Sequence, residues 1–188
     1  MNVKKVLVFL LVFICMAAFY YFYEYKGGEV RKEREELGKK ALVFSPDSLE
    51  SLRIFALAEE SSATDTVSLV REQGRWRLSS PVQAEADSQA VARLLSAAGS
   101  ATLDRVVEDS AAQLSVFGLE HPRLVLEVAP QGAQTPLRLM LGSKNPTGSY
   151  IYAANSLDPG RVILLNNWLY SDLDKSPHEL RDKKVLHF

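Results

Sequence analysis

The sequence predicts an α+β domain, mainly an antiparallel β-sheet with one or two packed helices, preceded by a single N-terminal transmembrane helix. Short runs in which apolar and polar residues alternate predict the sheet, and one segment with apolar residues at helical spacing predicts the main helix. An uninterrupted apolar run predicts the membrane helix. The chain therefore divides into a short segment at 1–5, an anchor at 6–23, a charged stalk at 24–40 and a single domain at 41–188.

The anchor prediction rests on 18 consecutive residues without charge, proline or glycine. At about 1.5 Å of rise per residue, such a helix spans roughly 27 Å, close to the hydrocarbon thickness of a bilayer. The alternative is a cleaved secretory signal, with Lys4 and Lys5 as its basic start and a weak cleavage site at Cys15-Met16-Ala17. The aromatic residues at 19–23 fit an interfacial belt better than a mature N-terminus, which favours an uncleaved anchor.

The stalk raises the question of orientation, because 11 of its 17 residues are charged and six of them are basic. A literal count of basic residues would place the domain in the cytoplasm. Long domains are translocated largely regardless of charge, so we expect a single-pass protein of the inner (cytoplasmic) membrane with a periplasmic domain. Basic and acidic residues nearly cancel, which favours a spacer over a lipid-headgroup site.

The strands are predicted, in order, from alternation or apolar runs at 52–56, 67–69, 76–78, 103–107, 124–128, 137–141, 150–152 and 162–165. Gln73-Gly74 and Gln131-Gly132 are expected to join neighbouring strands into hairpins. Further turns are expected at 145–148 and 158–160. These short connections favour antiparallel pairing.

The main helix is expected to begin at Asp87 or Ser88, either of which can cap it. Its apolar residues follow at i, i+3, i+4 and i+7 from Val91 and form one face, and Gly99 can close it. A helical turn is expected at 111–117 and a short helix at 167–173.

The two ends of the domain share a pattern. The residues at 39–44 read KKALVF and those at 183–188 read KKVLHF, which are 144 positions apart. Either the last strand completes this sheet, or a second copy of the unit begins at 183–188.

The order of the segments GRWRLSSP, SVFGLEHP, LRLMLG, SYIYA and RDKKVLHF resembles the bacterial family called domain of unknown function 4340, over about residues 40–188. The marks of this resemblance are Trp76, Pro81, Phe117, Gly118, Leu119, Pro122, Leu141, Gly142, Arg181 and Asp182. The resemblance implies an N-terminal anchor, an extracytoplasmic domain and an accessory role, because many members are encoded beside ABC-type transporters, including those linked to gliding motility. It implies no catalytic residues. Physically, the marks are typical of turns, strand ends and core packing.

Composition and motifs exclude several functions. Residues 41–188 carry 14 basic and 18 acidic side chains, a net charge of −4, so nucleic-acid binding is not expected. Cys15 is the single cysteine, which rules out an intrachain disulfide and a cysteine zinc site. No hydrolase elbow, P-loop or dinucleotide fingerprint occurs. The acidic and histidine residues at 172–179 match no metal motif, so neither metal nor cofactor is expected.

Three functions remain. The preferred one is a non-enzymatic accessory domain that binds a protein partner in the membrane or envelope, such as an ABC-type transport assembly. The second is a tethered module that binds a small molecule, lipid or glycan in a groove beside Tyr150 and Tyr152. The third is an anchored hydrolase. A broad apolar patch would favour the first, a closed apolar pocket the second, and converging titratable groups the third.

Overall fold

The computed structural model describes residues 3–21, 23, 32, 35–57 and 64–183. It divides the chain into two compact units, Met1–Lys39 and Lys40–Phe188. Each unit is described separately below.

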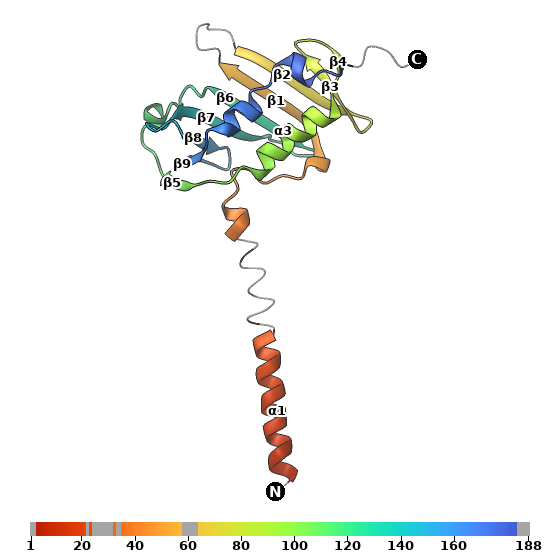
Figure 1. Ribbon diagram of the computed structural model, residues 1–188, viewed down its shortest axis with the longest axis vertical. Coiled ribbons are helices and arrows are strands. Elements are labelled where there is room, and N and C mark those ends of the chain that lie inside the picture. Colours follow the sequence, from red (N-terminus) through yellow and green to blue (C-terminus); the bar gives the residue numbers. More distant parts are fainter. Residues whose placement is uncertain (1–2, 22, 24–31, 33–34, 58–63, 184–188) are drawn as a thin grey trace. The chain divides into compact units, whose positions relative to one another are not determined.

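The first unit contains the helix α1 (Val3–Tyr20) (Figure 1). In its stalk, the Lys39 ammonium contacts the Glu35 carboxylate at 3.0 Å, an i,i+4 pair. Among the described residues, no helix combines the length and the apolar character that crossing a membrane requires. The expected span at 6–23 includes position 22, which lies outside the described residues, so the anchor stays a prediction.

The second unit is built on one antiparallel sheet of nine strands, ordered β4-β3-β2-β1-β6-β7-β8-β9-β5 (Figure 1). The strands are β1 (Leu49–Leu57), β2 (Thr64–Glu72), β3 (Arg75–Ser80), β4 (Ala84–Glu85), β5 (Arg105–Glu108), β6 (Leu124–Pro130), β7 (Leu137–Lys144), β8 (Tyr150–Asn155) and β9 (Asp158–Asn166). The expected α+β class with a mainly antiparallel sheet is confirmed.

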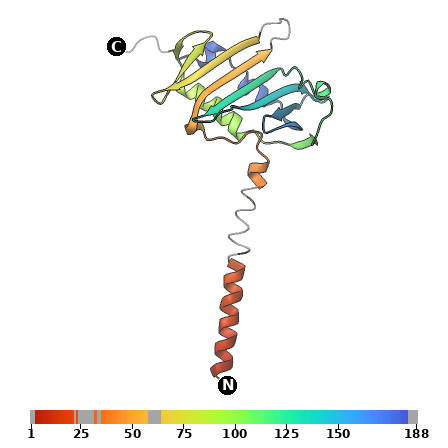
Figure 2. The same cartoon turned by 180° about the vertical axis from the view of Figure 1, so that it is seen from behind.

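Helices cover one face of this sheet. They are α3 (Ser88–Ser100), α4 (Trp168–Leu173) and α5 (Pro177–Leu180), and the described 3-10 turns are η2 (Pro46–Ser48) and η3 (Leu114–Phe117). The main core lies between α3 and the inward residues of the strands, including Leu52, Ile54, Leu126, Leu139 and Ile163, which are at most 3% exposed. In Figure 1 α3 crosses in front of the sheet, and in Figure 2 the strands stand in front of it.

The main helix begins where its local sequence predicts. The Asp87 carboxylate accepts hydrogen bonds from the backbone N–H groups of Gln89 and Ala90 at 2.8 and 3.2 Å, and all four predicted apolar residues are buried. The expected closure by Gly99 is wrong, because the helix runs to Ser100 and its C-cap is extended rather than left-handed. Gly99 instead lies beside the ring of Phe44.

Of the expected turns, the one at Gln73-Gly74 is confirmed and the one at 158–160 is not. Gln73 and Gly74 both have positive φ, 49° and 81°, as a two-residue hairpin turn of the primed type requires. The expected turn at 158–160 is wrong, because β9 already begins there. The Asn155 side-chain oxygen accepts from the N–H groups of Leu157 and Asp158 at 3.0 and 2.9 Å. This Asx turn moves the reversal two residues earlier.

The two ends of the domain are held by isolated bridges outside the named strands. Lys40 pairs with Thr102, and the Ala41 N–H donates to the Ala101 carbonyl at 2.8 Å. At the other end, Arg181 pairs with Ala86 beside β4. Residues 184–188 lie outside the described residues, so the proposed start of a second copy at 183–188 stays a prediction.

Candidate interaction surface

Two of the glycines that mark the resemblance meet where two backbones cross. Gly118 follows η3 with a φ of 68°, and a Cβ added there would lie 2.8 Å from the backbone nitrogen of Ser143. A Cβ added at Gly142 would lie 3.0 Å from the carbonyl carbon of Gly118 and closer still to the Phe117 oxygen. The two positions therefore accept only hydrogen, so that the loop after η3 can cross β7.

The remaining marks also occupy structural positions. Phe117 and Leu119 are buried in a second, smaller core cluster. Trp76 is half-buried against the main core, and Pro81 comes directly after β3. Pro122 precedes β6 by two residues, and Arg181 forms the bridge to Ala86 described above.

Tyr150 and Tyr152 lie on one face of β8, and both are half-buried. The ring of Tyr152 packs edge-on against Phe117, with ring centroids 5.0 Å apart, and it adjoins the second core cluster. This packing explains its partial burial. A ligand groove beside the two tyrosines stays a prediction.

The titratable groups with shifted pKa values serve local structure. Backbone N–H groups of Ala90 and Gln89 lower the pKa of Asp87, and the backbone N–H and hydroxyl of Ser176 lower that of Glu179 in a capping box. Burial, followed by the charge of Asp174, raises the pKa of Tyr170. Among the described residues, no group of three or more His, Cys, Asp or Glu could hold a metal ion.

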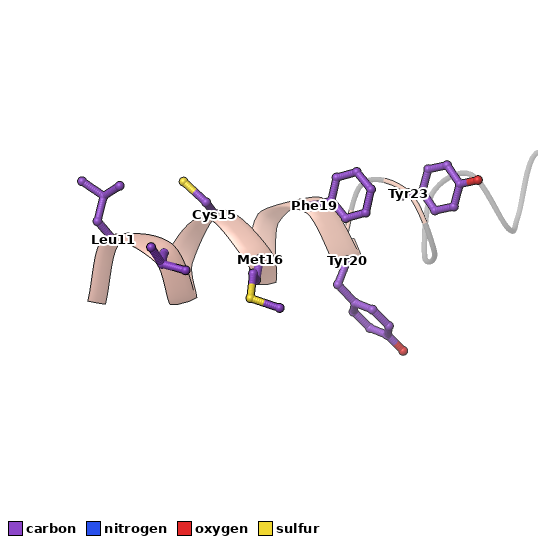
Figure 3. Close-up of a pocket in the computed structure, with 7 residues that line it drawn as sticks. Leu11, Cys15, Met16, Phe19, Tyr20 and Tyr23 are labelled. Atoms are coloured by element: carbon purple, nitrogen blue, oxygen red, sulfur yellow. The ribbon is translucent and has the colours of Figure 1, made fainter. Parts of the chain in front are cut away.

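The first unit carries an exposed apolar surface. Figure 3 shows it on α1 and the residues that follow, with Leu11, Cys15, Phe19 and Tyr23 recurring every fourth position. The rings of Phe19 and Tyr23 stack with centroids 5.4 Å apart and an angle of 6° between their planes. Large exposed apolar patches are typical of surfaces that contact a membrane or another protein.

The second unit carries a different surface, on the face of its sheet opposite α3, which we call the outer face (Figure 2). An apolar row crosses it. Phe55 on β1 pairs with Val125 on β6, and Val125 pairs with Met140 on β7. These three side chains are half-buried. Met140 packs against the second core cluster, as Leu114 of η3 also does, whereas Phe55 and Val125 are not among the residues packed against either core cluster. Their alternation with the main core places them toward the outer side.

A charged row lies beside the apolar row. Arg53 on β1 pairs with Glu127 on β6, and Glu127 pairs with Arg138 on β7. Arg138 Nε contacts Glu127 Oε1 at 2.5 Å, whereas Arg53 Nη1 lies 3.9 Å from Oε2. The Glu127 side chain is 8% exposed, and the two arginines are 58% and 54% exposed. The guanidinium groups therefore shield the carboxylate and keep much of their own surface in solvent.

A shallow groove of about 270 Å³ continues the outer face over β1, β2 and β3. Its polar lining consists of hydroxyl groups and one guanidinium, from Ser51, Thr66, Ser68, Ser79, Ser80 and Arg53. None of its lining residues, all of them described, carries a carboxylate. The groove therefore offers donors and a positive charge beside the apolar row.

Sequence reasoning missed the charged row. The Glu127–Arg138 half of this row could have been found from the predicted hairpin of β6 and β7, because the register of that hairpin sets the two residues opposite each other. The pairing of β1 with β6 joins segments about 70 residues apart, and alternation alone does not specify that register.

Comparison with known proteins bears on the second unit from Trp76 onward. A model of the family described as Domain of unknown function (DUF4340) matches residues 76–188. The chain belongs to this family. The DUF4340 match includes Glu127 and Arg138, while Arg53 and the first two strands precede it. Searches of curated proteins and of solved structures gave no match.

Proposed function

We propose that this DUF4340 protein is a membrane-tethered interaction domain outside the cytoplasm that binds a protein partner and performs no catalysis. The outer face is the observation that carries the proposal. On a sheet face that is exposed to solvent, the outward side chains are usually polar, but this face presents Phe55 and Val125 beside two arginines. Aromatic residues and arginine are enriched at protein interfaces.

The partner test compares two faces of the domain. Full-length tagged protein would be purified from gently solubilised native membranes and its companions identified by mass spectrometry. Val125→Glu places a charge in the apolar row, and Ala92→Glu places one on the exposed side of α3 as a control. We expect a stoichiometric partner with the wild type and with Ala92→Glu, and its loss with Val125→Glu.

Two results would count against this function. Equal recovery of the partner with Val125→Glu would show that the outer face is not the contact. Recovery of the protein alone, even after crosslinking, would contradict a protein-binding role. That the partner is an ABC-type transport assembly is a proposal that rests on the family resemblance.

The tether and the orientation form the other half of the proposal, supported by the apolar run at 6–23 and the exposed apolar side chains of α1. Cys15→Ser removes the single native cysteine, and Gln131→Cys then places one in the exposed loop between β6 and β7. An impermeant thiol reagent should label it in intact spheroplasts. Labelling only after lysis would place the domain in the cytoplasm.

A second candidate function is glycan binding. An open groove of about 980 Å³ beside β3 and β4 is lined by Trp76 together with charged side chains, among them Arg75, Arg77, Glu72 and Glu85. An aromatic ring beside such planar polar groups suits a sugar ring. Quenching of Trp76 fluorescence by envelope glycan fragments, in a Trp168→Phe background, would support this function, and unchanged fluorescence would count against it.

A further inference from the structure

We propose that the partner presents an acidic segment to the outer face, with a carboxylate bound by Arg53 in the hydroxyl-lined groove and apolar neighbours on Phe55 and Val125. This inference rests on the proposed function and specifies the chemistry of the partner.

Arg53 is the group that is available for such a contact. Its Nη1 reaches Glu127 only at 3.9 Å, while Arg138 holds the other oxygen of the same carboxylate at 2.5 Å. With 58% of its side chain exposed, Arg53 retains guanidinium surface that can reach an incoming group. A planar guanidinium can bind a carboxylate through two parallel hydrogen bonds.

The groove beside Arg53 has the matching polarity. Thr66 and Ser68 contribute hydroxyl groups from β2, and Ser79 contributes one from β3, where it donates to the Ser68 carbonyl at 3.2 Å. Since the lining has one positive charge and no carboxylate, a negatively charged group is favoured over a positive one.

The apolar row identifies the source of the carboxylate. Arg53 and Phe55 lie on the same face of β1, two residues apart, and Phe55 pairs with Val125 on β6. A free anion would use the guanidinium and leave this row exposed. A protein segment that carries acidic and apolar side chains together would cover both rows at once.

Glu127 gives the site a built-in competitor. Its carboxylate already attracts Arg53, so an incoming carboxylate must share or displace that interaction and is also repelled by the charge. Glu127 therefore acts on the incoming carboxylate indirectly, through Arg53 and through its own negative charge. Its replacement by glutamine should strengthen binding of an acidic segment, whereas removal of the Arg53 guanidinium should weaken it.

The probe is a fluorescent decapeptide of alternating Glu and Leu, compared with its Gln and Leu counterpart, and titrated with full-length protein in neutral detergent. We expect the acidic peptide to bind more tightly than the neutral one, and added NaCl to reduce that difference. Arg53→Ala should weaken binding of the acidic peptide by about tenfold. Glu127→Gln should tighten it, and Arg93→Ala, an exposed arginine on α3, should leave it unchanged.

Opposite signs for Arg53→Ala and Glu127→Gln exclude a merely structural effect, since two damaged folds would both weaken binding. Equal affinity for the two peptides, or complete displacement of the acidic peptide by an equal concentration of inorganic phosphate, would overturn the inference. If the peptides fail to discriminate while Val125→Glu still abolishes partner recovery, the acidic partner is wrong and the interaction surface remains. If Val125→Glu retains the partner, the proposed function itself fails.

Discussion

Replacing Gly142 by alanine tests the backbone crossing that supports the second core cluster. The new Cβ would lie 3.0 Å from the Gly118 carbonyl carbon and 3.1 Å from its oxygen, with the Phe117 oxygen nearer still. All three are backbone atoms, so the loop after η3 must move away from β7. That movement would also displace Phe117 and Leu119 from their cluster. Overpacking of this kind costs about 1–3 kcal/mol, and we expect the upper half of that range.

Gly99→Ala is the matched control. Its added Cβ would lie 3.6 Å from Phe44, an ordinary contact, and no positive φ is required there. Alanine inside a helix is more stable than glycine by about 0.5–1 kcal/mol, so this variant should be more stable than the wild type.

The assay is thermal unfolding of the full-length protein in mild detergent, followed by tryptophan fluorescence. Both tryptophans of the chain, Trp76 and Trp168, lie in the second unit, so the signal reports that unit alone. At roughly 2–4 °C per kcal/mol, Gly142→Ala should lower the Tm by roughly 4–12 °C, and Gly99→Ala should raise it slightly. An unchanged Tm for Gly142→Ala, or an equal fall for both variants, would refute the close-approach argument.

Three further predictions use the same assay. Glu127→Ala leaves Arg53 and Arg138 without their shared carboxylate and should lower the free energy of unfolding by about 1–3 kcal/mol. This is less than the value for a fully buried pair, because both arginines are half-exposed. An unchanged free energy of unfolding would contradict the shielding of the carboxylate. Leu126→Ala should cost about 2–5 kcal/mol, because Leu126 is 0% exposed in the main core, and a Tm within 1 °C of the wild type would contradict its placement there. The folded pKa of Asp87 lies below its ordinary value of 3.8, so its contribution to stability is present above that pH and is lost as the pH falls through the folded pKa. Asp87→Asn keeps an oxygen that can accept from the same N–H groups but does not titrate, so Tm should fall less steeply below pH 4 than in the wild type; parallel pH profiles would count against the cap.

Local signals in the sequence predicted the elements whose causes are local. The cap at Asp87 and the apolar spacing from Val91 together specify α3, and Gln73-Gly74 specifies the hairpin of β2 and β3. Elements that depend on distant partners were missed or misplaced. The two-residue strand β4 is held between β3 and the segment at Arg181, which no alternation could indicate.

The same distinction explains the candidate surface. A ligand groove was predicted beside Tyr150 and Tyr152 because the alternation of aromatic residues is visible within a single strand. Arg53, Glu127 and Arg138 come together only once β1 pairs with β6, so their chemistry is a property of sheet order. The apolar row is equally hidden, since Val125 and Met140 occupy positions that alternation assigns to the solvent side.

The most direct test of the interaction surface is crosslinking in living cells from single positions of the domain. A photo-crosslinking amino acid at Phe55 or Val125 reports on the outer face, and one at Ala92 or Ser96 reports on the exposed side of α3. We expect one discrete protein adduct from the first pair and none from the second. Adducts of equal yield from both pairs, or from α3 alone, would contradict a partner bound at the outer face.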